Sequence, residues 1–497
     1  MEINDTEIVW LYVVDSGKWL IKRKELISIA EDLMEKGKSV EGIVRYLTVE
    51  EIEEQAGAEK KMKAIIKARN DEILENLKLL YKSDMDNVNP EYIENLQFFR
   101  AKMVDFEMVL PGDRVEPVEV RLNYHSSGIF ILELWLKLKN MALTPDIINE
   151  LQLLPREEEE ITVKLPRQLL EDYSLINRKI AELLQKKPKS KIFTLNLTFH
   201  EIVWMYWAII AYIANNEKAK DSKELLHSLR YNVFHFFPIM VFHFPEVPSP
   251  EDLFEKHKAD LYRMLFQEIY LDSPHIRPQL IDDAFKNENN LAERTDDALF
   301  FSKESCILLY TKESQSILSY IAEKRKTSVE AQIFLEKLDV ILVQEFLNLQ
   351  RYTMEMYDYL LSKKSISEME TDELAQMRGS LSKVIEEFYN VKLLIKTSTH
   401  KRLERGRIQV FELEKSLEVL EKKLDLVDAA VTSIHNNLME FLTILLGILV
   451  QVGPIIAVTI VAPQYAVIAA TVSIGVFIGV YFLYKQLYRI WYRRSRK

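Results

Sequence analysis

The stretch FLTILLGILVQVGPIIAVTIVAPQYAVIAATVSIGVFIGVYFLY occupies residues 441–484 and contains no charged side chain. A single helix of this length would extend about 66 Å, roughly twice the hydrocarbon core of a bilayer, which is about 30 Å thick. We therefore expect the chain to fold back once here. The sequence predicts two transmembrane helices, at about 441–461 and 466–484.

A heptad repeat precedes this stretch. From Leu403 onward, apolar residues recur at alternating steps of four and three residues, which indicates a helix with one narrow apolar face. We predict a stalk helix over 403–440 that continues into the first span. Contact between subunits is the favoured use of its apolar face, and packing with other helices of the same chain is the alternative. The predicted oligomerisation seam consists of Leu417, Leu420, Leu424, Val427, Val431, Ile434 and Leu438.

The charge and cysteine content exclude several classes of protein. The net charge is −11 over 497 residues, and the basic residues after Tyr484 make the remainder still more acidic. This argues against general nucleic-acid binding, which needs clustered Lys and Arg. The single cysteine, Cys306, allows no disulfide within the chain.

The two ends of the chain predict its orientation. Residues 1–10 lack the features of a signal peptide, so we expect the N-terminal part in the cytoplasm. The basic tail at 485–497 places the C-terminus there too. The predicted localisation is the plasma membrane, as a multi-pass protein with both termini cytoplasmic.

Prolines and alternating apolar residues indicate a mixed domain over 1–311, either undivided or split into two subdomains near 85–100. Residues 312–402 carry heptad-like patterns without proline and predict a long-helix bundle. The predicted fold class is therefore an α+β cytoplasmic domain, a long-helix or coiled-coil stalk and a C-terminal two-helix transmembrane hairpin. We expect strands at 7–14, 103–109, 118–124, 129–138, 193–199, 232–244 and 306–311, and helices at 146–154, 200–214, 250–271 and 329–362.

Polar and small residues of the predicted hairpin are candidates for a pore and for helix packing. Thr443, Gln451 and Thr459 are the pore-lining candidates, although dense packing of the two spans without a pore is the alternative. The pore-entrance candidates Asn436, Asn437 and Glu440 equally suit helix residues wetted at the headgroups. Gly475 and Gly479 lie four residues apart and predict close packing of the spans.

Catalytic and metal-binding signals are weak. His200 and Glu201 begin a zinc-protease pattern, but Trp204 stands where the second histidine is required. His235 and His243 are too far apart on one strand to share a metal, and Cys306 lies in an apolar strand that predicts an inert, buried thiol. We predict no enzyme activity, no cofactor and no metal site.

The order of these parts resembles the CorA family of pentameric magnesium channels, chiefly over 306–497. The family's Gly-Met-Asn signature is absent, and the corresponding region reads Val461-Ala462-Pro463-Gln464-Tyr465. The resemblance implies a homo-oligomer, a pentamer, with an ion-conducting pore gated by the large cytoplasmic domain. A metal ion or a small molecule is the implied ligand. The alternative is a non-conducting membrane-tethered scaffold, or a sensor or effector that responds to a partner or a nucleotide messenger.

Overall fold

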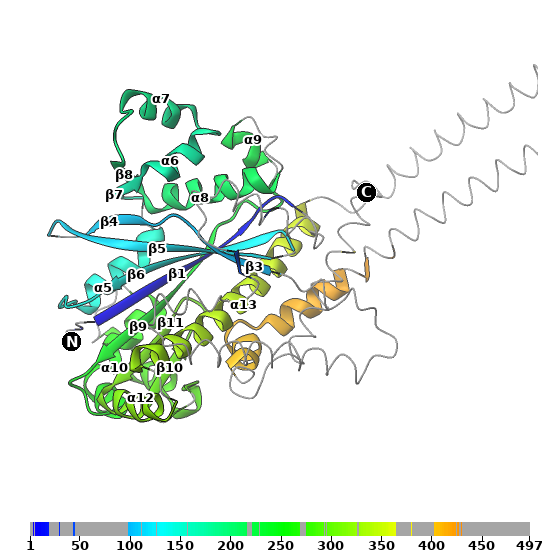
Figure 1. Ribbon diagram of the computed structural model, residues 1–497. Helices are drawn as coiled ribbons and strands as arrows, with labels where there is room; N and C mark the ends of the chain where they lie inside the picture. Colours follow the sequence, from blue (N-terminus) through cyan, green and yellow to red (C-terminus); the bar gives the residue numbers. More distant parts are fainter. Residues whose placement is uncertain are drawn as a thin grey trace, which may run out of the picture. The chain divides into compact units, whose positions relative to one another are not determined.

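A mixed sheet of eleven strands organises the computed structural model (Figure 1). The structure describes residues 3, 5–18, 29, 43–44, 98–110, 112–125, 127–156, 158–215, 221–227, 229–268, 275–292, 294, 296–325, 328–363, 379, 402–423, 425–426 and 429. They belong mainly to one compact unit, formed by Met1–Ser365 and Ala375–Lys423. The second unit, Ile366–Leu374 and Leu424–Lys497, lies almost wholly outside the described residues.

Nine strands follow one another across the sheet in the order β10-β11-β9-β1-β6-β5-β4-β7-β8, and β3 pairs with β5 and β2. Neighbours are antiparallel except for β9 and β11, which are parallel. The strands are β1 (Asp5–Asp15), β2 (Ile43–Val44), β3 (Phe98–Lys102), β4 (Phe106–Leu110), β5 (Arg114–His125), β6 (Ile129–Leu138), β7 (Glu160–Pro166), β8 (Ile192–Thr198), β9 (His235–Phe244), β10 (Asp297–Phe301) and β11 (Cys306–Thr311).

Helices cover both faces of the sheet, and Figure 1 shows α8 and α13 on opposite sides of it. Their starts follow local capping rules: Thr198 and Glu201 form a capping box for α8, and Ser249 caps α10. The helices are α5 (Pro145–Leu153), α6 (Arg167–Ser174), α7 (Arg178–Lys186), α8 (Phe199–Ala214), α9 (Ser222–His227), α10 (Pro250–Phe266), α11 (Pro278–Ala284), α12 (Lys312–Arg325) and α13 (Val329–Lys363).

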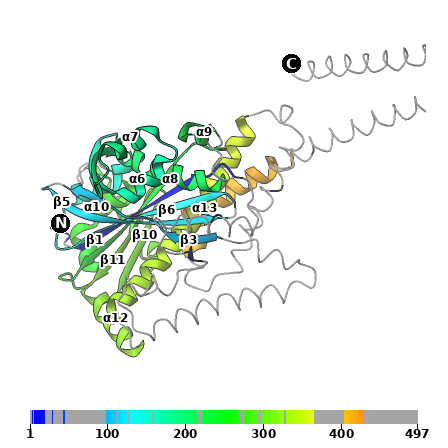
Figure 2. The same ribbon diagram turned by 45° about the horizontal axis from the view of Figure 1, so that its top comes forward.

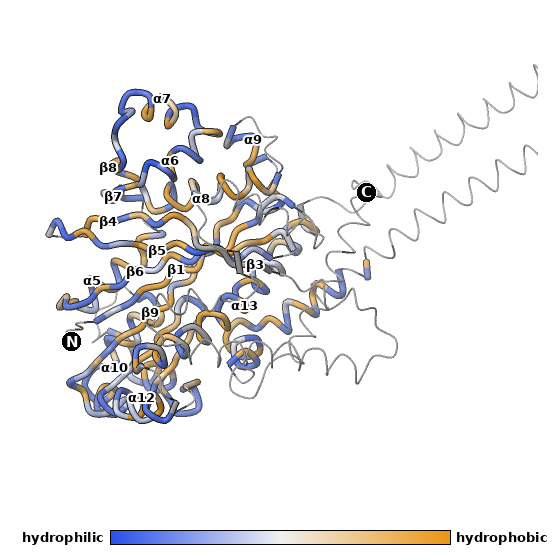
Figure 3. Tube along the Cα trace, viewed as in Figure 1, coloured by the Kyte–Doolittle hydropathy of each residue, from blue (hydrophilic) through white to orange (hydrophobic). Residues whose placement is uncertain are grey.

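The two faces of the sheet differ in chemistry. Trp10 on β1 faces α8, where its ring centroid lies 5.0 Å from that of Phe199. Val9 and its cross-strand neighbour Trp135 point the other way, toward Phe334 on α13. The α8 face is apolar and forms the main core, and Figure 3 shows hydrophobic residues along the central strands and on α8. The α13 face carries several buried charges, described below.

The predicted fold class is corrected to a mixed α/β fold built on one large sheet. No helix in the described part of the chain is long and apolar enough to cross a bilayer. The predicted spans, 441–461 and 466–484, lie outside the described residues. The transmembrane hairpin, the ion channel and the multi-pass plasma-membrane localisation are therefore not part of the corrected description.

Several strand predictions are confirmed. The structure forms β1, the β5–β6 hairpin, β8 and β11 where alternation or apolar runs indicated strands. β9 contains Pro238 and lies between β1 and β11. Its register with β11 begins only at Ile239, so Pro238 has a strand neighbour on the β1 side alone. A residue without an N–H is tolerated there for that reason.

The predicted unbroken stalk helix is interrupted at its beginning. A π-helix spans Gly406–Val410, and Glu412 then adopts a left-handed conformation with φ of 52° before the helix at 413–423. The segment 402–423 lies against α13, where a Cβ added to Gly406 would meet Leu347 at 2.4 Å. Figures 1 and 2 both show this segment beside α13. Arg402 donates to the Leu291 carbonyl, and Lys423 pairs with Asp358.

Candidate functional site

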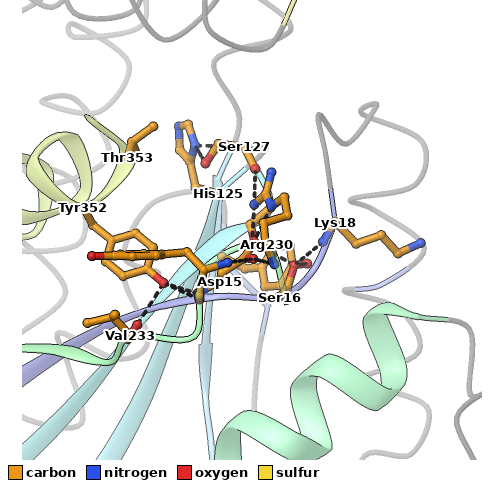
Figure 4. Close-up of polar contacts among 12 residues, drawn as sticks. Asp15, Ser16, Lys18, His125, Ser127, Arg230, Val233, Tyr352 and Thr353 are labelled. Atoms are coloured by element: carbon orange, nitrogen blue, oxygen red, sulfur yellow. Dashed lines mark hydrogen bonds and ion pairs between the residues drawn. The ribbon is translucent and has the colours of Figure 1, made fainter. Parts of the chain in front are cut away.

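A buried polar cluster lies where β1 ends, at Asp15 and Ser16 (Figure 4). The turn of the β5–β6 hairpin, the segment leading into β9, and the middle of α13 all contribute side chains or carbonyl groups to it. We call it the β1 junction, comprising Asp15, Ser16, Tyr124, Arg230 and Tyr352.

Asp15 and Arg230 form a buried ion pair at the centre of the junction. Arg230 donates to the Asp15 carboxylate from Nε, over 2.9 Å, and from one terminal nitrogen. The backbone N–H groups of Arg230 and Tyr231 donate to the other carboxylate oxygen, over 2.7 and 3.3 Å. Burial opposes the charge on Arg230, but Asp15 outweighs burial and raises the pKa of Arg230. The carboxylate of Asp15 is thus engaged by donors on both oxygens, which suits a structural pair rather than a general base.

Ser16 closes the hairpin turn against β1. Its hydroxyl donates to the Gly128 carbonyl over 2.6 Å and accepts from the Tyr124 hydroxyl over 2.8 Å. Gly128 has φ of 78°, and a Cβ at this position would lie 2.1 Å from the Lys18 carbonyl oxygen. A glycine is therefore required in this turn.

Tyr352 connects the junction to α13. Its hydroxyl accepts from the Asp15 N–H over 3.0 Å and lies 3.0 Å from the Val233 carbonyl, to which it donates. Burial, together with the nearby Asp15 charge, raises the pKa of Tyr352 well above its usual value. On the other side of the sheet, the Trp207 indole donates to the Asp15 carbonyl over 2.9 Å. Helices on both faces are thus hydrogen-bonded to one residue of β1.

A partly exposed rim surrounds Tyr352. It consists of Tyr231, His235, Arg351, Glu355 and Tyr359. The Tyr231 ring lies 5.3 Å from Tyr352 and 5.2 Å from Tyr359, centroid to centroid, and Tyr359 is 37% exposed. Both Nε2 of His235 and Nε of Arg351 lie 3.0 Å from the Glu355 carboxylate.

The rim groups alter one another's ionisation. Burial raises the pKa of Glu355, but the contacts with His235 and Arg351 prevail and lower it below its usual value. Burial and the negative charge of Glu355 raise the pKa of Tyr231. At neutral pH the rim therefore presents neutral tyrosine rings beside an ionised carboxylate and an arginine.

A second set of buried charges lies between the sheet and α13. Lys337 donates to Glu7 over 2.5 Å and lies 5.3 Å from the Trp135 ring centroid. Arg121 stacks over the same ring at 4.7 Å, and the Trp135 indole donates to Glu133 over 2.9 Å. Burial favours neutral Glu7, but Lys337 prevails and lowers the pKa of Glu7, whereas burial lowers the pKa of Lys337. This pairing gives α13 a specific position on the sheet.

Few of the sequence-predicted site residues can be placed. Leu417 and Leu420 lie in the helix at 413–423 and are buried at 2% and 1% exposure within a single chain. Their part in contacts between subunits stays a prediction. The other predicted seam, pore-lining, pore-entrance and span-packing residues lie outside the described part of the chain: Leu424, Val427, Val431, Ile434, Leu438, Asn436, Asn437, Glu440, Thr443, Gln451, Thr459, Gly475 and Gly479.

The weaker chemical signals have structural explanations. Glu201 belongs to the capping box of α8, and the His243 ring stacks on Tyr310 at 5.1 Å. Burial lowers the pKa of His243. Cys306 is fully buried as predicted, and burial raises the pKa of its thiol, which favours the inert neutral form. Within the described residues, no group of three or more His, Cys, Asp or Glu side chains could hold a metal ion.

The β1 junction and its rim have no direct signal in the sequence. Asp15 and Ser16 directly follow the strand predicted at 7–14, and Arg230 lies 215 residues after Asp15. A buried ion pair at such separation leaves no periodic pattern. The one usable signal was a carboxylate directly after a fully apolar strand, because such a position is commonly buried and then needs a partner.

No protein family, no curated protein and no solved structure matches this chain. The resemblance to the CorA family therefore stays a prediction.

Proposed function

We propose that the protein is a non-catalytic sensor or effector that binds a nucleotide on the rim of the β1 junction. The observation that carries this proposal is the rim itself. It places two partly exposed tyrosine rings, Tyr231 and Tyr359, beside Arg351 and Glu355 and connects them through Tyr352 to a buried ion pair.

The chemistry of the rim matches the parts of a nucleotide. Tyrosine rings stack on bases of any sequence. A carboxylate such as Glu355 accepts hydrogen bonds from the amino groups of a base, and an arginine binds phosphate. The Arg351 side chain is 31% exposed and Glu355 38% exposed, so both are accessible from solvent.

The hydrogen bonds of the junction support a non-catalytic role. Both Asp15 oxygens accept from Arg230 and from backbone N–H groups, and the Ser16 hydroxyl both donates and accepts. Among the described contacts of these two groups, none is with the free base that nucleophilic catalysis requires. The arrangement suits transmission of a binding event from α13 through Tyr352 to Asp15 at the end of β1.

Calorimetric titration of the full chain tests the ligand. The probes are AMP, ATP, cyclic di-AMP, cyclic di-GMP and cyclic oligoadenylates. At least one should bind, and Tyr231→Ala or Tyr359→Ala should weaken it about tenfold or more, since each base stacked on an aromatic contributes about 1–3 kcal/mol. Tyr320→Ala on α12 is the matched control, because Tyr320 is 61% exposed and lies outside the rim.

Two results would contradict the proposal. Failure of every probe to bind, or equal weakening by the Tyr320→Ala control, would exclude the rim as a nucleotide site. Chemical conversion of a bound nucleotide during prolonged incubation would exclude a non-catalytic role. Protection of β1 from hydrogen exchange by the bound probe would support transmission through Tyr352.

A further inference from the structure

The outer edge of β8 has no strand partner among the described residues. β8 pairs with β7 along its whole length, from Ile192 opposite Pro166 to Thr198 opposite Glu160, and it ends the strand order of the described sheet. Its sequence, IFTLNLT, contains no charge and no proline. Charges, prolines and bulges are the usual protection of such edges against pairing with another chain.

The exposed side of β8 is suited to contact. Ile192, Thr194 and Asn196 are exposed on one face, and Ile192 is 54% exposed. β10, at the other end of the sheet, differs, because all five of its residues are buried. Only one end of the described sheet therefore offers an accessible uncharged strand.

Charges of opposite sign lie beside the two ends of β8, basic on the chain before β8 and acidic at the start of the neighbouring β7. Four exposed lysines precede or begin the strand: Lys186, Lys187, Lys189 and Lys191. At the other end, Thr198 lies opposite Glu160, which follows the exposed Glu158 and Glu159. An antiparallel copy of the same strand would place each basic end beside an acidic end, because the direction reverses. The edge is thus complementary to itself in charge.

We propose that β8 pairs with β8 of a second copy of this chain, joining two sheets into one across a two-fold axis. Backbone hydrogen bonds between the strands supply affinity, as in other cases of strand addition. Across a two-fold axis, the same surface of each copy contacts the other copy, which is the usual arrangement of a homodimer. The opposite charges at the two ends select the antiparallel orientation.

Charge reversal on the full chain tests this surface. Lys189→Glu/Lys191→Glu gives one variant with two acidic ends, and Glu158→Lys/Glu159→Lys gives another with two basic ends. Sedimentation velocity over a range of concentrations should show that each variant alone dimerises about tenfold more weakly than the natural chain, since cross-strand charge pairs of about 0.2–1 kcal/mol become repulsive. An equimolar mixture of the two variants should recover dimers, because the opposite charges then meet at both ends.

Cysteine cross-linking tests the geometry. A symmetric antiparallel pair that overlaps the whole strand is centred on Leu195 and brings Thr194 of one copy opposite Asn196 of the other. The double variant Thr194→Cys/Asn196→Cys should therefore form a disulfide-linked dimer under mild oxidation. Glu150→Cys, exposed on α5, is the control and should stay monomeric on a non-reducing gel. The native Cys306 is buried and does not compete.

Three outcomes would overturn the proposal. They are a chain that stays monomeric at every concentration, association that neither charge-reversed variant weakens, and cross-linking at position 150 as efficient as at 194 and 196. Recovery in the mixed sample together with cross-linking on β8 would establish it.

Discussion

Lys337 on α13 donates a hydrogen bond to Glu7 on β1 across 330 residues of sequence, with 2.5 Å between Nζ and Oε2. Both side chains are largely buried, at 5% and 13% exposure. A buried ion pair specifies position more than it adds stability, because desolvation offsets much of the attraction. The pair therefore fixes how α13 lies on the sheet.

We expect Lys337→Met to lower the free energy of unfolding by about 3–5 kcal/mol, because Glu7 is left buried without its cation. The double variant Glu7→Leu/Lys337→Leu should be near neutral by the same argument. Denaturant unfolding measures both. Lys258→Met, which removes the cation paired with the 67% exposed Asp282, should change stability by less than about 1 kcal/mol. A similar loss in this control would contradict the explanation.

Arg230→Met should destabilise the protein by about 3–5 kcal/mol, since Asp15 would keep only backbone donors in a buried site. Arg230→Lys should recover part of this loss, because a lysine cannot reproduce the two side-chain donors of the guanidinium. Thermal or denaturant unfolding measures the order of stability, which should fall from the natural chain to Arg230→Lys and then to Arg230→Met. The exposed pair of Arg178 and Glu182 supplies the control variant Arg178→Met, expected within about 0.5 kcal/mol of the natural chain.

The glycines at 128 and 112 form a matched pair. Both have positive φ, of 78° and 82°, but only at Gly128 would a Cβ collide with backbone, at 2.1 Å from the Lys18 carbonyl oxygen. Gly112→Ala should cost about 1–2 kcal/mol from its conformation alone. Gly128→Ala should cost clearly more, as measured by unfolding of the two variants. Equal losses of unfolding free energy in the two variants would show that the turn at Gly128 shifts to accommodate the added methyl group without further cost.

Asp297 predicts a pH dependence of stability. Burial raises the pKa of this residue to about 6, despite the opposing charge of Arg294. The folded state therefore binds this proton more tightly than the unfolded state, whose carboxyl has a pKa near 3.8. Asp297 thus contributes increasing stability as pH falls from about 6 to 4, by up to roughly 3 kcal/mol.

The variant Asp297→Asn isolates this contribution. The free energy of unfolding should be measured for both proteins from pH 4 to 7. As pH falls, the free energy of unfolding of the natural chain should rise relative to that of the variant. A difference that is constant over this range would show that Asp297 ionises normally. Other carboxylates with lowered pKa, such as Glu355, act equally in both proteins and cancel.

The sequence predicted those elements whose pattern is local. The β5–β6 hairpin alternates over both strands, and α8 begins at a capping box, so each could be predicted without distant contacts. β7 was missed, because its start, Glu160, extends an acidic run that indicated a loop. β10 was missed because five apolar and acidic residues are too few to distinguish a strand from its surroundings.

The use of the C-terminal heptad pattern could not be predicted for a different reason. The seam residues Leu417 and Leu420 are apolar and buried, but a heptad pattern does not specify the surface that it meets. Here the segment 402–423 packs along α13 within one unit of the chain. The β1 junction was equally inaccessible, since an ion pair between positions 15 and 230 depends on the whole strand order of the sheet.

The close approach of Gly406 to Leu347 has an evolutionary consequence. A side chain at 406 would overlap the Leu347 methyl group, so the two positions cannot change independently. Homologous sequences that carry alanine or serine at the first position should carry a smaller residue than leucine at the second. Such covariation would identify distant relatives in which the segment crosses the helix at the same point.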